Sequence, residues 1–289
     1  MATSLQTARA ELFGQVRDPT AGAWFAEAAM SAVARVIGFD GWCLFAVDPL
    51  TGIRTVMFSR GALQCAQERM VHNETVEQDA NRYADLATGP RPVGVLATSV
   101  RAQPRSPRLH DILVPEGFRS ELRLVLVSGG RYWGALSLWR DDPRHPFTDD
   151  DAADAVELGD PLSHVVRRYN VGSPGSSPYP AQAGVVLVDR MGRILDVSPE
   201  AHAWLRTMAD SWPDGVTEGD VMRMVYEVAA AASGKVDRPP LCRVRMPGGG
   251  WLVASGTRVQ SGEVDVVVVL GGGDGRTVAP AFAAWCGLT

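Results

Sequence analysis

The chain has 289 residues, with 28 Lys and Arg against 33 Asp and Glu, and a formal net charge of −5. Hydrophobic residues make up 46% and charged residues 21%, which is typical of a globular protein and excludes a largely disordered chain. An acidic chain without a basic block lacks the cations that neutralise phosphates, so we expect no nucleic-acid binding by this sequence itself.

The apolar runs and the cysteines restrict the cellular compartment. The run at 264–270 is far shorter than the roughly 20 residues of a membrane span, and the N-terminus has no signal-peptide segment. We therefore expect a cytoplasmic protein with no membrane partner. The four cysteines contain no Cys-x-x-Cys pair, so we expect free thiols rather than disulfides or zinc ligands: Cys43, Cys65, Cys242 and Cys286.

In the first half, the pattern predicts helices and two hairpins. The helices are expected at 5–16, at 22–37, where apolar residues recur at helical spacing, and at 149–168, where Thr148 caps a first turn of three aspartates. The stretch 64–86 is polar and helix-friendly. The hairpin strands are expected at 41–47 and 54–59, and at 118–127 and 132–139.

Residues 172–180 hold two glycines, three serines and three prolines, which cannot form a core. We predict a linker at 171–181. It follows an N-terminal helical extension (1–19) and a first domain (20–170), and it precedes a second domain (182–271) and a tail (272–289).

The second half predicts strands at both ends and helices between them. Strands are expected at 183–188, 193–197, 242–246, 251–259 and 263–270, with helices at 198–204 and 218–232; Ser198-Pro199-Glu200 is an N-cap signal. The predicted fold class is α+β, with two domains that each contain a central antiparallel sheet flanked by helices.

Two segments carry a resemblance to known domains. The strand GWCLFAV (41–47) and the stretch SELRLVLVSGGRYWGALSLWRDDPRHPFTDDDAADAVELGDPLSHVV (120–166) resemble a GAF domain over about residues 20–170. The segments GVVLVDRMGRILDVSPEAHAWL (184–205) and RVRMPGGGWLVASGTRV (243–259) are similar to a PAS domain, with Ser198-Pro199 where Asn-Pro is usual.

The last residues, VAPAFAAWCGLT (278–289), resemble the segment that leads into the helix-turn-helix domain of actinobacterial LuxR-family regulators. The three resemblances together imply a signal-sensing and dimerisation module of such a regulator, lacking its C-terminal DNA-binding domain. Its partners would be a small-molecule effector, a second copy in a homodimer, since LuxR-type readers act as dimers, and DNA only through the missing domain.

Catalytic motifs are sparse, and we expect no enzyme. Residues 271–276 fail the G-x-G-x-x-G pattern and no long helix is expected behind them, so we interpret them as a linker. We predict no metal and no cofactor. The resemblance leaves one alternative open, a haem ligated by one of the histidines: His72, His110, His145, His164 or His202.

The resemblance implies a ligand enclosed between the first sheet and its inserted helices. The candidate ligand-binding residues lie on the two hairpins and beside them: Cys43, Phe45, Phe58, His110, Arg119, Trp133 and Leu136. Because strand residues alternate between faces, the sequence does not say which of them line a pocket, and core packing or a solvated loop is the alternative for each.

Two other functions stay open. One is a GAF-fold thiol enzyme similar to free methionine sulfoxide reductase, for which Cys43 and Cys65 are the candidates in the first domain. The other is a protein-interaction module without a ligand.

Overall fold

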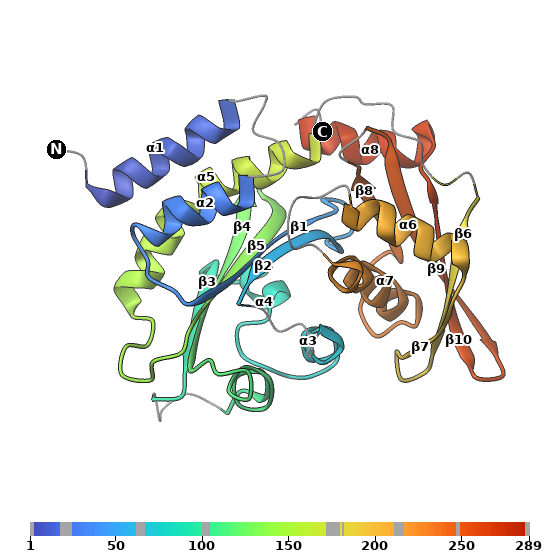
Figure 1. Cartoon of the computed structure of the whole chain (residues 1–289), viewed down its shortest axis with the longest axis horizontal. Coiled ribbons are helices and arrows are strands. Elements are labelled where there is room, and N and C mark those ends of the chain that lie inside the picture. The colour runs from blue at the N-terminus through green and yellow to red at the C-terminus, as the bar shows by residue number, and fades with distance from the viewer. Residues whose placement is uncertain are drawn as a thin grey trace. The chain divides into compact units, whose positions relative to one another are not determined.

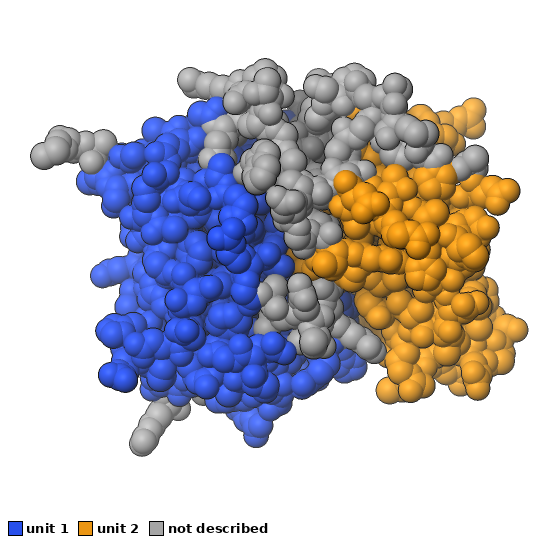
Figure 2. Space-filling view, viewed as in Figure 1, with its two compact units in different colours: residues 1–45, 58–169 blue, residues 46–57, 170–289 orange. Residues whose placement is uncertain are grey.

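A computed structural model describes residues 3–17, 25–61, 67–99, 105–171, 180, 182–210, 217–246 and 249–286. The chain forms two compact units, which Figure 2 shows in two colours. The first unit comprises residues 1–45 and 58–169, and the second comprises residues 46–57 and 170–289.

The first unit contains a five-stranded antiparallel sheet and its helices (Figure 1), except that residues 46–57, which include the end of β1 and the start of β2, belong to the second unit. The strand order is β2-β1-β5-β4-β3. The elements in chain order are α1 (Ser4–Arg17), α2 (Phe25–Ala34), β1 (Gly41–Val47), β2 (Arg54–Arg60), α3 (Gln67–Thr75), α4 (Tyr83–Thr88), β3 (Val93–Ala97), the π-helix η2 (Arg108–Leu113), β4 (Ser120–Ser128), β5 (Arg131–Arg140) and α5 (Asp149–Val171).

Both faces of this first sheet are covered. Every residue of β1 is buried, as are the first seven residues of β4. In Figure 1, α1, α2 and α5 lie on one side of the sheet, and α3 and α4 lie on the other. A strand covered on both faces needs apolar side chains in both directions, which explains the nearly continuous apolar runs GWCLFAV and LRLVLV.

Polar residues start α5 where the sequence predicts. The backbone N–H of Asp151 donates to Thr148 Oγ1 at 3.2 Å, and the N–H of Thr148 donates to the Asp151 carboxylate at 2.8 Å. These reciprocal bonds satisfy donors that a helix N-terminus otherwise leaves unpaired.

The second unit contains another five-stranded antiparallel sheet, in the order β7-β6-β10-β9-β8. Counted within each sheet, this is the strand order of the first sheet. The elements are β6 (Gly184–Asp189), β7 (Ile194–Val197), α6 (Pro199–Asp210), α7 (Glu218–Ala232), β8 (Leu241–Arg245), β9 (Trp251–Ser261), β10 (Val264–Gly272) and α8 (Gly275–Cys286).

Helices α6 and α7 pack on this second sheet, and small residues allow the close approach. A Cβ on Gly184 would lie 2.2 Å from the backbone nitrogen of Ala201 in α6, and one on Gly256 would lie 2.9 Å from Ala232 Cβ in α7. Trp204 of α6 fills the core, and its Nε1 donates to the carbonyl of Gln182 at 3.0 Å.

Buried ion pairs also lie within this second unit. Arg243 Nη1 donates to Asp48 Oδ2 at 2.8 Å, and Arg54 Nε lies 2.6 Å from Glu227 Oε1. The four side chains are buried. Such pairs are costly to break from one side, because the remaining charge stays in the interior without its partner.

The α+β prediction with two antiparallel sheets is confirmed, and so are the N-caps at Thr148 and Ser198. No long helix was expected behind the glycine run, and the structure has a helix of 12 residues there. Gly271 and Gly272 end β10, and α8 begins at Gly275. Asp274 accepts the N–H of Thr277 at 2.7 Å, and Val278, Ala281 and Ala284 are buried, which together stabilise this helix.

Within the described part of the chain, every helix is too short or too polar to serve as a membrane span.

Candidate functional site

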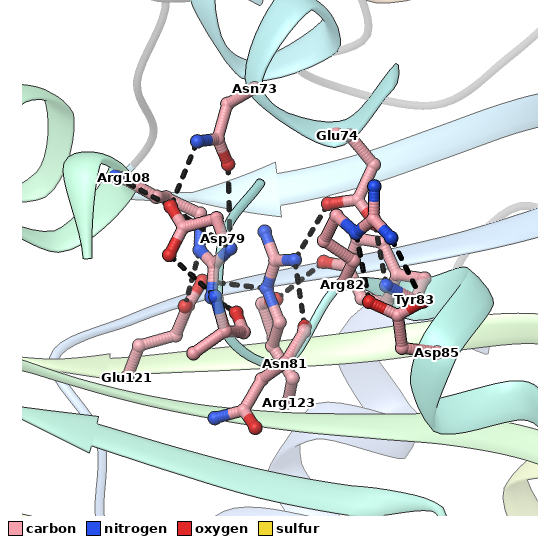
Figure 3. A network of polar contacts seen from close by, with 12 residues as sticks. Asn73, Glu74, Asp79, Asn81, Arg82, Tyr83, Asp85, Arg108, Glu121 and Arg123 are labelled. Carbon is pink, nitrogen blue, oxygen red and sulfur yellow. Dashed lines mark hydrogen bonds and ion pairs between the residues drawn. The ribbon is translucent and has the colours of Figure 1, made fainter. Parts of the chain in front are cut away.

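One face of the first sheet lies under residues 67–99 and 105–113, which we call the inserted segment. It contains α3, α4, β3 and η2. Three charged side chains of this segment and two charged side chains of β4 are linked by ion pairs (Figure 3). We call these five residues the charge cluster: Glu74, Asp79, Arg108, Glu121 and Arg123.

Glu121 lies at the centre of the charge cluster. Its Oε2 accepts a hydrogen bond from Arg108 Nε at 2.8 Å, and its Oε1 accepts one from Arg123 Nε at 3.0 Å. Trp139 Nε1 donates to the same Oε1 at 3.3 Å. None of the three charged side chains is more than 1% exposed, so the interactions are little screened by water.

Arg108 ties η2 to the segment before it. Its Nη1 donates to Asn73 Oδ1 at 3.4 Å and its Nη2 to the carbonyl of Ala80 at 2.9 Å. Its backbone N–H donates to Asp79 Oδ2 at 2.8 Å, which also accepts from Asn73 Nδ2 at 2.8 Å. Arg108 therefore holds α3, the following turn and β4 together.

Arg123 is bound on two of its three nitrogens. Besides the bond to Glu121, its Nη1 donates to Glu74 Oε2 at 2.7 Å and to the carbonyl of Asn81 at 3.2 Å. Its guanidinium lies over the Tyr83 ring, 4.1 Å from the centroid. Among the described residues, Arg123 Nη2 finds no hydrogen-bond partner, although it is buried.

The backbone around the charge cluster is unusual at two places. Arg108 belongs to a π-helix, a rare conformation that is frequent at functional sites. Asn81 has φ of 56°, the one left-handed residue other than glycine in the described chain. Its side chain lies on Gly94 of β3, where a Cβ would come within 2.3 Å of Asn81 Cγ.

The ionisation of the carboxyl groups follows from these partners. Burial works to raise the pKa of Glu121, but the charges and hydrogen bonds of Arg108 and Arg123 outweigh it and leave that pKa below its ordinary value. Burial likewise opposes the lowered pKa of Asp79, and hydrogen bonds from Ser106, Arg108 and Asn73 prevail. Both groups are therefore carboxylates at neutral pH.

Of the candidates on β1 and β2, Phe45 lies beneath the inserted segment. Its ring meets the Tyr83 ring edge-on at 4.9 Å, and Tyr83 in turn is hydrogen-bonded to Ser137 Oγ at 2.6 Å. Cys43 and Phe58 are both buried. Cys43 alternates with Trp42 and Leu44 along β1, so it shares the face of Phe45.

The candidates on β5 lie on the opposite face. Leu136 pairs with Leu124, whose side chain contacts the position of Gly159 in α5. The register shifts between Leu126 and Val127, and Trp133 lies under the Arg167 guanidinium of α5 at 5.1 Å. The sheet therefore separates Leu136 and Trp133 from Phe45 and the charge cluster.

The two polar candidates for ligand binding, His110 and Arg119, do not reach the charge cluster. His110 is exposed on η2, and Arg119 Nη1 donates to the carbonyls of Val114 and Phe118 at 3.0 and 3.1 Å. Arg108, two positions before His110, is the buried side chain of η2 that pairs with Glu121 in the charge cluster.

The charge cluster was not among the predicted sites, although β4 contains a signal for it. Glu121 and Arg123 are charged residues two positions apart in an otherwise apolar strand, SELRLVLVS. Such a pair faces one side of the sheet, and in a strand covered on both faces it must be buried and paired.

The described residues include no group of three or more His, Cys, Asp or Glu side chains placed to hold a metal ion. The five histidines are spread over both units, and the closest acidic contact among them is His202 Nδ1 with Glu218 Oε1 at 2.6 Å.

No protein-family model matches the sequence, and no curated protein matches it either. Solved structures do match by fold. A phycoerythrobilin-bound GAF domain from a cyanobacterial phytochrome aligns at 11% identity and a TM-score of 0.43, over 59% of this chain and 97% of that one.

Two further matches come from regulatory proteins. The GAF domain of a two-component sensor histidine kinase from Bacillus halodurans aligns at 15% identity and a TM-score of 0.33, over 47% of this chain and 87% of that one. The N-acylhomoserine lactone-dependent LuxR-family factor CepR2 from Burkholderia cenocepacia aligns at 18% identity and a TM-score of 0.37, over 57% and 93%. At these values the matches assign neither a family nor a function.

Proposed function

We propose that the first unit senses a small molecule that binds between its sheet and the inserted segment. The observation that carries this proposal is the charge cluster. Buried ion networks stabilise a fold no better than well-packed apolar residues of similar volume, because desolvation cancels much of the attraction. Titratable groups with shifted pKa values also gather at functional sites, which makes the charge cluster the candidate for the binding site.

The geometry supports a switch that acts through the inserted segment. Arg108 and Arg123 connect β4 to α3 and to the turn at Ala80 and Asn81. We call the protein closed when the inserted segment lies on the sheet, as in this structure, and open when the segment is displaced from it. A ligand that competes for one of these bonds binds the closed and the open state with different affinity. Such a difference shifts the population between the two states, which is the requirement for sensing.

The wider role that we propose is the sensory and dimerising part of a LuxR-type transcriptional regulator. The sequence resemblances to GAF, PAS and LuxR-leading segments support it, together with the two α+β units. In this role the effector would bias two arrangements of a homodimer, and a helix-turn-helix domain would contact DNA.

Native mass spectrometry of the freshly purified whole chain tests the sensing proposal. We expect a retained small molecule that is released on denaturation, and we expect Glu121→Gln to lose it because the arginines then lack their shared carboxylate. Glu157→Gln is the matched control, since Glu157 is an exposed partner of Arg9.

Two results would contradict the proposal. One is a retained molecule that Glu121→Gln leaves in place, which would locate the ligand elsewhere. The other is a chain that holds no molecule and whose melting temperature is unchanged by fractionated cell extract.

A further inference from the structure

We infer that the ligand of the charge cluster presents a neutral carbonyl oxygen to Arg123 Nη2. This inference rests on the sensing function proposed above and adds the chemical class of the ligand. The hydrogen-bond donors, the charge balance and the aromatic neighbours of Arg123 support it.

The donors of Arg123 are used unequally. Nε is bound to Glu121, and Nη1 is bound to Glu74 and to the carbonyl of Asn81. Nη2 carries two further N–H groups that have no acceptor among the described residues. In Figure 3 this nitrogen points away from β4 toward the inserted segment.

A buried donor without an acceptor is costly, and native proteins rarely retain one. The side chain of Arg123 is only 1% exposed, so bulk water does not reach this nitrogen in the closed state. An acceptor brought by a ligand would recover this lost interaction. The ligand therefore gains a hydrogen bond that the closed state lacks, and its entry requires the inserted segment to move.

The charge balance selects a neutral acceptor. Three carboxylates, those of Glu74, Asp79 and Glu121, surround two guanidinium groups. Arg82 and Asp85 at the edge pair with each other at 2.8 Å and add no net charge. A carboxylate or phosphate would add a second unbalanced negative charge in a buried place, whereas a carbonyl oxygen accepts the bond without that cost.

The neighbours of Nη2 indicate the rest of the ligand. The Arg123 guanidinium is stacked on Tyr83, and Phe45 meets the Tyr83 ring edge-on. These rings place apolar surface beside the unused donor. A carbonyl attached to an apolar group, such as an amide or an ester with an alkyl chain, fits both features.

Three probes of one chain length test the inference: hexanamide, hexanoate and hexylamine. Each is titrated into the whole chain while the ¹⁵N signals of the arginine guanidinium groups are recorded. We expect hexanamide to shift the Arg123 Nη2 signal, and hexanoate and hexylamine to leave it unchanged.

The variant Arg123→Lys supplies a second readout. Lysine keeps the positive charge between Glu74 and Glu121 but removes Nη2, so we expect hexanamide to bind about tenfold more weakly, the loss of about one hydrogen bond. Arg82→Lys is the matched control at the edge and should bind hexanamide as the wild type does. Hydrogen exchange in β4 shows whether the variants are folded.

Several results would overturn the inference. They are tighter binding of hexanoate than of hexanamide, undiminished binding by folded Arg123→Lys, and an unchanged Nη2 signal with all three probes. If Arg123→Lys does not fold, the wild-type Nη2 signal decides alone. A retained cellular ligand that is lost in Glu121→Gln but carries no neutral carbonyl refutes this inference and leaves the sensing function intact.

Discussion

Arg108 and Glu121 form an ion pair of 2.8 Å in which neither side chain is more than 1% exposed. They come from η2 and from the start of β4, so the pair attaches the end of the inserted segment to the strand beside β3. Glu121 also accepts from Arg123, which makes one carboxylate the shared partner of two buried cations. The stability of this face and its proposed sensing role therefore depend on the same group.

We expect Glu121→Gln to destabilise the first unit by about 3–5 kcal/mol, because it leaves two guanidinium groups buried without their shared carboxylate. Glu157→Gln should change little, since Arg9 and Glu157 are an exposed pair. Denaturant unfolding of the whole chain, with hydrogen exchange in β4 and β5 to identify the unit, measures both. Equal effects of the two substitutions would show that the charge cluster contributes nothing particular to stability.

The charge cluster also predicts a dependence of stability on pH. The pKa values of Asp79 and Glu121 lie below the ordinary 3.8 and 4.5. The folded state therefore binds fewer protons than the unfolded state there, and stability rises with pH. The contribution is complete above about pH 4.5 and is lost as the pH falls through the lowered folded values.

Melting temperatures of the wild type and of Glu121→Gln across the acid range check this dependence. We expect the wild type to lose more stability on acidification than the variant, because the variant has already lost the ionisable group. Parallel curves for the two proteins would refute the assigned role of Glu121.

Local signals predicted most of the fold. Thr148 before three aspartates, and Ser198 before Pro199, are caps that act within a few residues, so both helix starts are where the sequence places them. The apolar runs of β4 and β5 likewise identify strands by composition alone. The alternating burial of the second sheet is equally local: in β6, Val186 and Val188 are buried, whereas Val185 and Leu187 are only half-buried.

The charge cluster was not predictable in the same way, because its partners are far apart in sequence. Arg123 meets Glu74 across 49 positions and Arg108 meets Asn73 across 35. No propensity predicts the π-helix at Arg108. Asparagine tolerates the left-handed region better than most residues, but that tolerance does not single out Asn81 among the asparagines of the chain. The face assignment of Trp133 depends on a register shift in β5, which alternation along the strand does not anticipate.

Asn81 and Gly94 predict a non-additive pair of substitutions. Gly94→Ala places a Cβ 2.3 Å from Asn81 Cγ, so the side chain of Asn81 must leave its bond to the carbonyl of Val95. We expect a cost of about 1–3 kcal/mol. In an Asn81→Gly background the clash disappears and the left-handed φ of 56° suits glycine, so Gly94→Ala should then cost little.

A double-mutant cycle on the four proteins measures this interaction. We expect a coupling of at least about 1 kcal/mol between the two positions. Additive effects would show that Gly94 is required for another reason.

The alternative function as a thiol enzyme predicts the reactivity of the cysteines. The candidate thiols are Cys43 and Cys65, and Cys65 lies outside the described residues. Cys43 and Cys242 are buried, and burial with the nearby Asp48 and Glu227 charges raises the pKa of Cys242 well above its ordinary value. We expect both to resist iodoacetamide at neutral pH until the chain is denatured, as mapped by mass spectrometry. Rapid labelling of Cys43 in the native protein would favour the thiol enzyme over the sensor.

Gly184 and Gly271 supply a matched test of the packing in the second unit. Both lie in strands of its sheet, and neither has a left-handed φ. Gly184→Ala would bring Cβ to 2.2 Å from the backbone nitrogen of Ala201, so α6 must move away from β6, at a cost of about 1–3 kcal/mol or more. Gly271→Ala meets Ala183 Cβ at an ordinary 3.7 Å and should be neutral or stabilising by up to about 1 kcal/mol. Hydrogen exchange in β6 and β10 measures both effects, and a Gly184→Ala protein as well protected as Gly271→Ala would refute the close approach of α6.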